Sequence, residues 1–548
     1  MNRIANLVLV AMLLSLMACE NRKPNNQESA AHEIDMDQFA SHVEQLASDE
    51  FLGRKPFTEG ETKTVEYLTA EFEKLGLKGA NNGSYTQNVP MVEIDGSCSE
   101  LMNIRGEGVE IDLEHFADYM AVCPSPVDSA ALSNSELVFA GYGIVAPEYD
   151  WNDYEGIDWT GKTAIVLVND PGFRSGDSTL FKGDEMTYYG RWTYKYEEAA
   201  RQGCAGLIIV HQTEPASYGW NVIQSGWNGA QLILESDLPK VDVEAWISLE
   251  STEKILAGTD LAGKDLRALA RDSGFKATPL GLTASMSITN KIRRDESQNV
   301  LAMIPGNERK DEVVIYTAHW DHFGIGIPID GDSIYNGAID NATGTAALLS
   351  IAEAMLEYGP MKRTVVLLAV TAEEQGLLGS KYYSEHPVFA PAKTVAAINM
   401  DAISAPAPMK DITIRGFGQS NLDEYAADVA EAHGRYILPD PDPEKGFFFR
   451  SDHFNFAKIG IPAIHSKGDF EAFGMTADEI KAKKDNYTQN IYHQPSDEYQ
   501  MDSSMRQGIE GDIRYYLELG LKIADSDAFP EWYDGSEFKA AREASLKE

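Results

Sequence analysis

The chain has 548 residues, of which 43% are hydrophobic and 10% aromatic, and it contains 45 glycines and 23 prolines. This composition excludes a collagen, a low-complexity disordered chain and a coiled coil, and the length allows about two to four domains. The 86 acidic and 46 basic residues give a net charge of −40. We therefore expect no nucleic-acid partner, because such a surface repels a phosphate backbone.

The N-terminus has the layout of an export signal. Arg3 precedes an apolar run from Ile4 to Met17, which is too short for a stable transmembrane helix. Residues 1–18 are predicted to be a signal peptide, and the segment that ends at Cys19 resembles the lipobox of bacterial lipoproteins. This resemblance implies a lipid anchor at Cys19 as the only membrane attachment and a place in the bacterial cell envelope. An ordinary signal peptide cleaved nearby is the alternative.

The segments upstream of about residue 280 differ in composition and predicted secondary structure. Residues 19–33 are rich in Asn, Glu and Ala and are expected to be a disordered tether. Two helices are predicted next, over Met36–Ala47 and Glu61–Leu75. From about Ser135 to Leu280, short apolar strands alternate with loops rich in Gly, Asp and Trp. This pattern predicts a compact, strand-rich inserted domain.

After about Asn299, apolar strand patterns alternate with helical ones. A helix rich in Ala and Leu is expected over Ala342–Tyr358. The strands are expected over Val313–Thr317, Thr364–Val370, Thr394–Ile398 and Ile461–Ile464. Fully apolar strands separated by helices indicate an α/β fold with a mainly parallel mixed sheet that helices cover on both faces. Ligands are then expected at the carboxyl ends of the strands.

Two segments contain the residue types of known functional sites but lack the context that those sites require. Gly156–Thr163 fits the P-loop pattern, but a strand pattern follows it where a phosphate-binding helix N-terminus should stand. Ser451, Asp452 and His453 are the residue types of a hydrolase triad, but consecutive residues cannot line up as nucleophile, base and orienting acid. We therefore expect neither nucleotide binding nor a serine hydrolase.

Three cysteines follow Cys19. An exported protein meets oxidising conditions, so a Cys98–Cys123 disulfide and two free thiols are both open. Cys204 stands just before an apolar run and is expected to be a small buried packing residue. No cysteine pair has the spacing of a zinc site.

Metal-ligand residue types follow successive predicted strands. The segments that carry them are Ala318–His322, Asn336–Gly344, Thr371–Gly376, Asn399–Asp401 and Tyr492–Asp497. In this order they resemble the co-catalytic zinc aminopeptidases and the related glutamate-carboxypeptidase-like exopeptidases. Leu46–Arg54 resembles the family's opening, and Phe139–Gly143 through Gly161–Lys162 resembles the start of its protease-associated domain.

The resemblance implies two Zn²⁺ ions per chain and assigns roles to eight residues. The implied metal ligands are His319, Asp340, Glu374, Asp401 and His493, with Asp340 as the bridge. Imidazole and carboxylate ligands suit zinc. Among the implied catalytic residues, Glu373 is the general base, Asp321 holds the ring of His319 through its carboxylate, and Tyr492 hydrogen-bonds the oxyanion. Asp497 could orient His493 or be structural, and the role of His322 stays open.

The resemblance also implies a division of the chain. Its parts are a signal peptide (1–18), a tether (19–33), a first catalytic part (34–130), a protease-associated insertion (131–285), a second catalytic part (286–530) and a C-terminal tail (531–548). The insertion is expected to wall one side of the site, either with its tryptophans Trp151, Trp192, Trp220 and Trp227 or with these residues serving as ordinary core or surface packing.

The implied function is hydrolysis of the N-terminal peptide bond of peptides that have a free N-terminus. A dipeptidase or carboxypeptidase of the same family is an alternative, although no arginine occurs between Asp452 and His493 to hold an acidic substrate. A glutaminyl cyclase-like enzyme with one zinc and a non-catalytic surface-binding lipoprotein are further alternatives. The sequence leaves the oligomeric state and the preferred side chain open.

Overall fold

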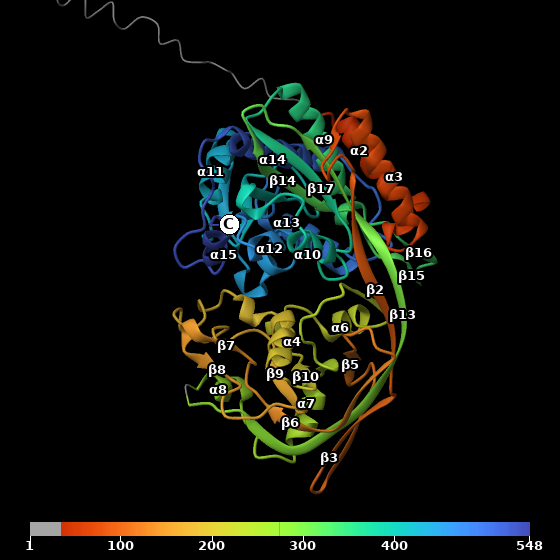
Figure 1. The fold of residues 1–548 in the computed structure, drawn as a ribbon, viewed down its shortest axis with the longest axis vertical. Helices are drawn as coiled ribbons and strands as arrows, with labels where there is room; N and C mark the ends of the chain where they lie inside the picture. The colour runs from red at the N-terminus through yellow and green to blue at the C-terminus, as the bar shows by residue number, and fades with distance from the viewer. Residues whose placement is uncertain (1–33, 273, 548) are drawn as a thin grey trace, which may run out of the picture.

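The computed structural model describes residues 34–272 and 274–547. The predicted signal peptide, the tether and the lipid site at Cys19 lie outside these residues. Figure 1 shows two lobes joined by two long strands, β2 (Thr86–Cys98) and β13 (Thr278–Ile304). Within the described residues, no helix has both the length and the hydrophobicity that crossing a bilayer requires.

The lobe that holds most of the two predicted catalytic parts, called the catalytic lobe below, contains the α/β fold that the sequence predicts. Its four central strands lie parallel in the order β17–β14–β18–β21, and β13 pairs antiparallel with β17 at one side. Beyond β21 the sheet continues through β19 and β20. The bounds are β14 Arg309–His319, β17 Arg363–Val370, β18 Thr394–Asn399, β19 Asp411–Arg415, β20 Tyr436–Pro439 and β21 Ala463–Lys467.

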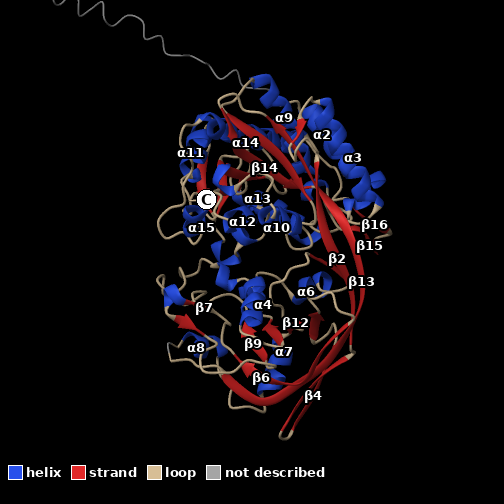
Figure 2. Ribbon diagram, viewed as in Figure 1, coloured by secondary structure: helices blue, strands red, loops and turns tan. Residues whose placement is uncertain are grey.

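Helices cover both faces of this sheet, as Figure 2 shows in blue against the red strands. One face packs against α2, α3, α9, α11 and α14, and the other against α10 and α12. The helix bounds in this lobe are α2 Met36–Leu46, α3 Glu59–Lys74, α9 Thr343–Tyr358, α10 Leu378–Glu385, α11 Leu422–Ala432, α12 His453–Lys458, α13 Ala477–Asn490, α14 Ser503–Asp525 and α15 Lys539–Ser545. The prediction of a mainly parallel sheet with helices on both faces is therefore confirmed.

Most predicted elements of this lobe keep their places. The predicted strand at Ile461–Ile464 begins instead at Ala463, directly after Pro462, which has no N–H to donate to a neighbouring strand. A small hairpin, β15 (Gly324–Ile329) with β16 (Asp332–Tyr335), follows the first metal-ligand segment.

The second lobe is the strand-rich insertion. Its strands β6, β9, β10 and β12 are parallel, and β12 also pairs with β5. The strand bounds are β3 Leu101–Gly106, β4 Val109–Glu114, β5 Tyr119–Val122, β6 Ser129–Phe139, β9 Thr163–Leu167, β10 Gly206–Val210, β11 Ala230–Ile233 and β12 Val243–Ile247. The helices are α4 Trp192–Arg201, α5 Thr213–Ala216, α6 Trp220–Gly226, α7 Leu249–Leu256 and α8 Leu266–Arg271.

The structure departs from the predicted boundaries at two places. Residues 101–122 belong to the predicted first catalytic part, yet Met102, Ile104 and Tyr119 pack in the core of the insertion. Residues 531–548 were expected to form a tail, yet Trp532 is buried and donates its indole N–H to the carbonyl of Gly460 at 2.9 Å. Phe538 is buried beside Trp532, so the hydrophobic effect favours packing of this segment against the catalytic lobe.

The two rejected motifs have the structures that their contexts predict. Gly156–Lys162 leads into strand β9 at Thr163 rather than into a helix. The Ser451 hydroxyl donates to Asp401, and Asp452 accepts from Ser380, so neither residue bonds to His453.

Candidate metal centre

The predicted ligands converge at the carboxyl ends of the parallel strands. His319 is the last residue of β14, Glu374 follows β17, and Asp401 follows β18. Asp340 lies in the turn before α9, and His493 lies in the loop after α13. Residues far apart in sequence therefore meet at one edge of the sheet, as the topology of a parallel sheet requires.

The ligand atoms form two groups that share Asp340. In the first group, His319 Nε2 lies 3.3 Å from Asp340 Oδ1 and 3.4 Å from Asp401 Oδ1. In the second, His493 Nε2 lies 3.3 Å from Asp340 Oδ2 and 3.2 Å from Glu374 Oε2. Zinc binds nitrogen and oxygen at about 2.0–2.2 Å, so two ligands of one tetrahedral ion are separated by about 3.3–3.6 Å. All four separations fall in or next to this range, and each oxygen of Asp340 faces a different histidine.

The ring of His319 is oriented for metal binding. Its Nδ1 lies 3.2 Å from the carbonyl oxygen of Asp321, which can only accept a hydrogen bond. Nδ1 therefore carries the proton, and the lone pair of Nε2 in the neutral ring faces two carboxylates. That arrangement is repulsive unless a metal ion, or a proton on Nε2, lies between the ring and the carboxylates. The donor set thus fits a metal ion on an observation of this chain alone.

The concentration of carboxylates in the site also favours a bound cation. Burial opposes a charged imidazole, yet the carboxylates of Glu374 and Asp340 raise the pKa of His493 to about 10. Burial likewise opposes charge on His319, but Glu373, Asp340 and Asp401 raise its pKa well above the usual value. Without metal, the site holds protons to neutralise its acids. Zinc ions would replace these protons, because ligand imidazoles must be neutral.

The carboxylate of Asp321 does not hold the ring of His319, as the resemblance implies, but has other partners. Its carboxylate lies 3.8 Å from His319 Nδ1, which is too long for a hydrogen bond. Instead it accepts the backbone N–H of Glu373 at 3.0 Å and approaches that of Glu374 at 3.4 Å. Asp321 thus orients His319 through its carbonyl and fixes the segment with the base and a ligand through its carboxylate.

Glu373 stands where the predicted general base is needed. One of its carboxyl oxygens lies within 4.8 Å of ligand atoms of both His319 and Glu374. Burial, together with the nearby Asp401, Glu374 and Asp452, raises its pKa well above the usual value. A carboxylate with a raised pKa takes up a proton readily, as a general base must.

The turn that carries Asp340 is held by two residues outside the ligand set. Asp497 is fully buried and accepts the backbone N–H groups of Ile339 and Asp340, both at 3.0 Å. Asp497 therefore positions Asp340 rather than His493. Arg54 is also buried and donates to backbone carbonyls that include those of Asn336 and Gly337, just before Asp340.

Tyr492 and His322 lie beside the second group. The Tyr492 ring stacks on the His493 ring with centroids 3.7 Å apart, and 42% of the residue is exposed. Its predicted bond to an oxyanion stays a prediction. His322 lies within hydrogen-bond distance of the ligand Glu374, and the sequence offered no signal for this contact beyond the proximity of His322 to His319.

Tyrosine and arginine side chains, rather than the predicted tryptophans, bring the insertion close to the centre. Trp192 and Trp227 pack against each other inside the insertion with ring centroids 5.9 Å apart. Tyr188 contacts Phe454 of the catalytic lobe at a centroid distance of 5.2 Å. Arg450 lies over the ring of Tyr218 at 5.7 Å.

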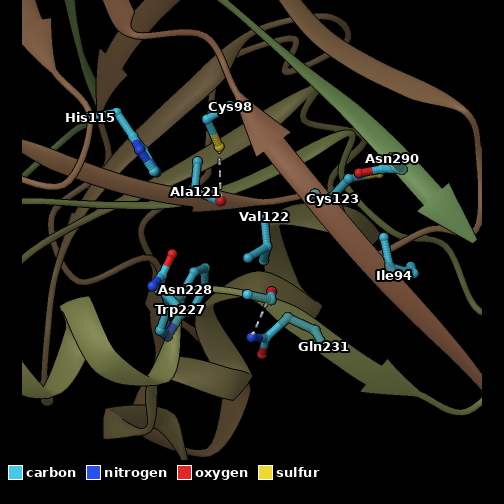
Figure 3. Close-up of a pocket in the computed structure, with 12 residues that line it drawn as sticks. Ile94, Cys98, His115, Ala121, Val122, Cys123, Trp227, Asn228, Gln231 and Asn290 are labelled. Atoms are coloured by element: carbon cyan, nitrogen blue, oxygen red, sulfur yellow. Dashed lines mark hydrogen bonds between the residues drawn. The ribbon is translucent and has the colours of Figure 1, made fainter. Parts of the chain in front are cut away.

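A small cavity in the insertion lies apart from this centre (Figure 3). Cys98 and Cys123 both line it and both are free thiols. Their sulfur atoms approach the carbonyls of Ala121 and Ser125 at 3.2 and 3.3 Å, so the disulfide that the sequence allows is absent from the described residues. Cys204 is buried, as predicted.

The segment that carries the candidate metal centre is similar to known proteins. Residues 299–511 match the sequence profile described as Peptidase family M28. A probable zinc metalloprotease from Pyrenophora teres f. teres is 30% identical over 267 residues, which cover 42% of this chain and 55% of the relative. The probable glutamate carboxypeptidase AMP1 from Arabidopsis thaliana is 26% identical over 387 residues, which cover 66% of this chain and 50% of the relative. The chain thus spans about half the length of these curated relatives.

A solved structure shows the same fold. The aminopeptidase from Aneurinibacillus sp. strain AM-1 superposes with a TM-score of 0.51 at 19% identity, covering 91% of this chain and 96% of that protein. This likeness supports the fold, while the profile match contains His319, Asp340, Glu374, Asp401 and His493. Residues 299–511, which carry the candidate metal centre, are therefore similar to peptidase family M28 and to zinc metalloproteases.

Proposed function

We propose that the chain is a di-zinc exopeptidase that hydrolyses the N-terminal peptide bond of peptides with a free N-terminus. The observation that carries this proposal is the set of four separations of 3.2–3.4 Å around Asp340. When bound, the two ions would polarise the scissile carbonyl and supply a nucleophilic water at neutral pH. His319, Asp340 and Asp401 would hold one ion, and His493, Asp340 and Glu374 the other.

The protein's own residues divide the remaining work. Glu373 takes the proton of the attacking water and later delivers it to the leaving amine. Asp321 keeps Glu373 in place through the backbone bond at 3.0 Å. Tyr492, which stacks on His493, would donate a hydrogen bond from its hydroxyl to the oxyanion that develops on the carbonyl.

Substrates with free and blocked N-termini test this assignment. Aminoacyl substrates should be turned over, and their N-acetylated counterparts should be poor substrates, because the free α-amine is expected to bind beside the ions. Equal turnover of the two would reject an aminopeptidase. A stoichiometry of one zinc per chain would instead favour a glutaminyl cyclase-like enzyme.

A second candidate, a dipeptidase or carboxypeptidase, is favoured by one feature between the lobes. Arg191 is 9% exposed and is placed beside Arg450 and Tyr218, with no acidic partner among the described residues. Burial and the charge of Arg450 lower the pKa of Arg191 to about 9. The Nε atoms of both arginines are buried without a hydrogen-bond partner.

Arg450 also adjoins the metal centre in the chain. The residue after Arg450, Ser451, donates to Asp401 Oδ2 at 2.6 Å. A buried cation without a counter-ion is costly, so an external anion is a natural partner for it. The absence of arginine between Asp452 and His493 is thus offset by one arginine just before this segment and one from the insertion.

Peptides that differ only at the C-terminus separate the two candidates. If the arginines bind a substrate carboxylate, dipeptides should be better substrates than the same dipeptides with an amidated C-terminus. An aminopeptidase that ignores the C-terminus should treat both alike.

We further propose that the protein is exported and held at the bacterial cell envelope through Cys19, and that the insertion is a protease-associated domain. The Cys19 motif and the Phe139–Gly143 segment support these two proposals. A Cys19→Ser variant that stays in the membrane fraction would contradict the anchor.

A further inference from the structure

His322 is the third histidine of the metal centre, and its side chain is fully buried. It lies three residues after His319, in the segment that leads from β14 to the β15–β16 hairpin. Its Nδ1 is 2.6 Å from Glu374 Oε1. A carboxylate oxygen can only accept, so Nδ1 carries the proton and donates.

The two oxygens of Glu374 therefore have different partners. Oε1 receives the hydrogen bond from His322, while Oε2 lies 3.2 Å from His493 Nε2. The second distance suits two ligands of one zinc ion. The first does not, because atoms 2.6 Å apart at zinc–ligand distances of about 2.1 Å would subtend only about 76° at the ion. The contact between His322 and Glu374 is a hydrogen bond, although His322, Asp340 and Glu374 do offer atoms within 4.8 Å of one another.

The ring of His322 is fixed by its surroundings. A Cβ added to Gly337 would lie 2.5 Å from Cγ of His322, so only glycine fits at that position. The Phe323 ring packs against both His322 and His493, at centroid distances of 5.0 and 4.6 Å. A ring held in this way aims its N–H at one oxygen and keeps it there.

We propose that His322 is a positioning residue of the second zinc site: by holding Oε1 of Glu374, it makes Glu374 present only Oε2 to the ion shared with Asp340 and His493. The first site has no corresponding contact to His322, since its ligands His319 and Asp401 are bonded to the carbonyl of Asp321 and to Ser451. Loss of His322 should thus weaken one zinc site and leave the other. This inference rests on the proposed pair of zinc ions.

Zinc titration of metal-free protein, in competition with a chromophoric chelator, tests the inference. The wild type should bind two ions. His322→Leu should bind the first with wild-type affinity and the second about 10- to 100-fold more weakly, the usual effect of removing a hydrogen-bond partner of a ligand. His322→Asn, whose side-chain amide can donate to Glu374, should recover most of the second affinity.

His42→Leu is the matched control. His42 is also a buried histidine, with a 2.6 Å hydrogen bond between its Nδ1 and the Tyr67 hydroxyl, but it lies in α2. This variant should bind both ions as the wild type does, while thermal unfolding of the metal-free variants shows that each one folds.

Two results would overturn the inference while leaving the two-metal centre intact. One is a folded His322→Leu variant that binds both ions with wild-type affinity. The other is a His322→Asn variant that loses the second ion as completely as His322→Leu does. A wild type that binds fewer than two ions would instead overturn the proposed function itself.

Discussion

Glu373 and Glu374 are neighbours in the chain but have different surroundings. Glu374 is tied to His322 and faces His493, and its pKa lies below the usual value, because these histidines outweigh the effects of burial and of Asp340. Glu373 keeps a raised pKa, first because it is buried and then because acids surround it. One carboxylate is thus suited to bind a cation and the other to exchange a proton.

The Glu373→Gln variant separates these tasks. We expect it to bind zinc as the wild type does, because Glu373 is outside the proposed ligand set, and to lose about 10²–10⁴-fold in turnover. Metal analysis and steady-state kinetics on the same preparation check both parts. Unchanged turnover would remove Glu373 from its role.

The raised pKa values of His319 and His493 predict how zinc affinity depends on pH. The neighbouring carboxylates favour the protonated form of both rings in the metal-free protein, raising the pKa of His493 to about 10 and that of His319 well above its usual value, and each ring must lose a proton before Nε2 binds an ion. Affinity should therefore fall as the pH falls, by about tenfold per unit for each ring that releases a proton, and for His493 this trend should end near pH 10. Zinc titrations at several pH values, with proton release measured by calorimetry in different buffers, test this. An affinity that is constant with pH would contradict it.

Arg191 is expected to lower the stability of the protein while it contributes to substrate binding. Replacing this buried, unpaired cation with Met should raise the free energy of unfolding by about 1–4 kcal/mol. If Arg191 binds a substrate carboxylate, the same variant should lose the preference for free over amidated dipeptides. Denaturant unfolding and paired kinetics measure the two effects. A loss of stability would show that Arg191 has a structural partner.

At the scale of elements, the sequence predicts which residues lie at the strand ends. It does not predict the long-range contacts that hold these residues in place. The apolar runs before His319, Glu373 and Asp401 are local patterns, so they place these residues at one edge of a sheet. Arg54 reaches the carbonyl of Gly337 across 283 positions, and Arg191 meets Arg450 across the two lobes. Such pairs depend on tertiary packing, which no local periodicity encodes. The carboxylate of Asp321 was assigned to the wrong partner for the same reason.

Arg54 joins three segments around the site. It donates to the carbonyls of Leu46, Trp320, Asn336 and Gly337 at 2.6–2.8 Å. Arg54→Met leaves four buried acceptors without this donor, so we expect a loss of at least about 3 kcal/mol in unfolding free energy, together with weaker zinc binding. Arg105→Met, on the exposed β3–β4 hairpin, is the control and should change stability by less than about 0.5 kcal/mol. Similar losses in the two variants would contradict the role of Arg54.

At the scale of the molecule, β13 connects the lobes into one sheet. Of its 27 residues, 13 pair with β2, and others pair with β3 and β6 in the insertion and with β17 in the catalytic lobe. The insertion is therefore attached through continuous strands and brings Tyr188 and Arg191 to the catalytic lobe. The sequence indicates the insertion by its short apolar strands and its loops rich in Gly, Asp and Trp. Residues 101–122 also belong to it, because they pack in its hydrophobic core, and only the fold shows this packing.

The proposed function depends on two zinc ions that would share Asp340. Anomalous scattering from crystals grown with zinc tests this directly. We expect two peaks about 3.5–4 Å apart, one beside His319 and Asp401 and the other beside His493 and Glu374. A single peak, or peaks away from Asp340, would contradict it.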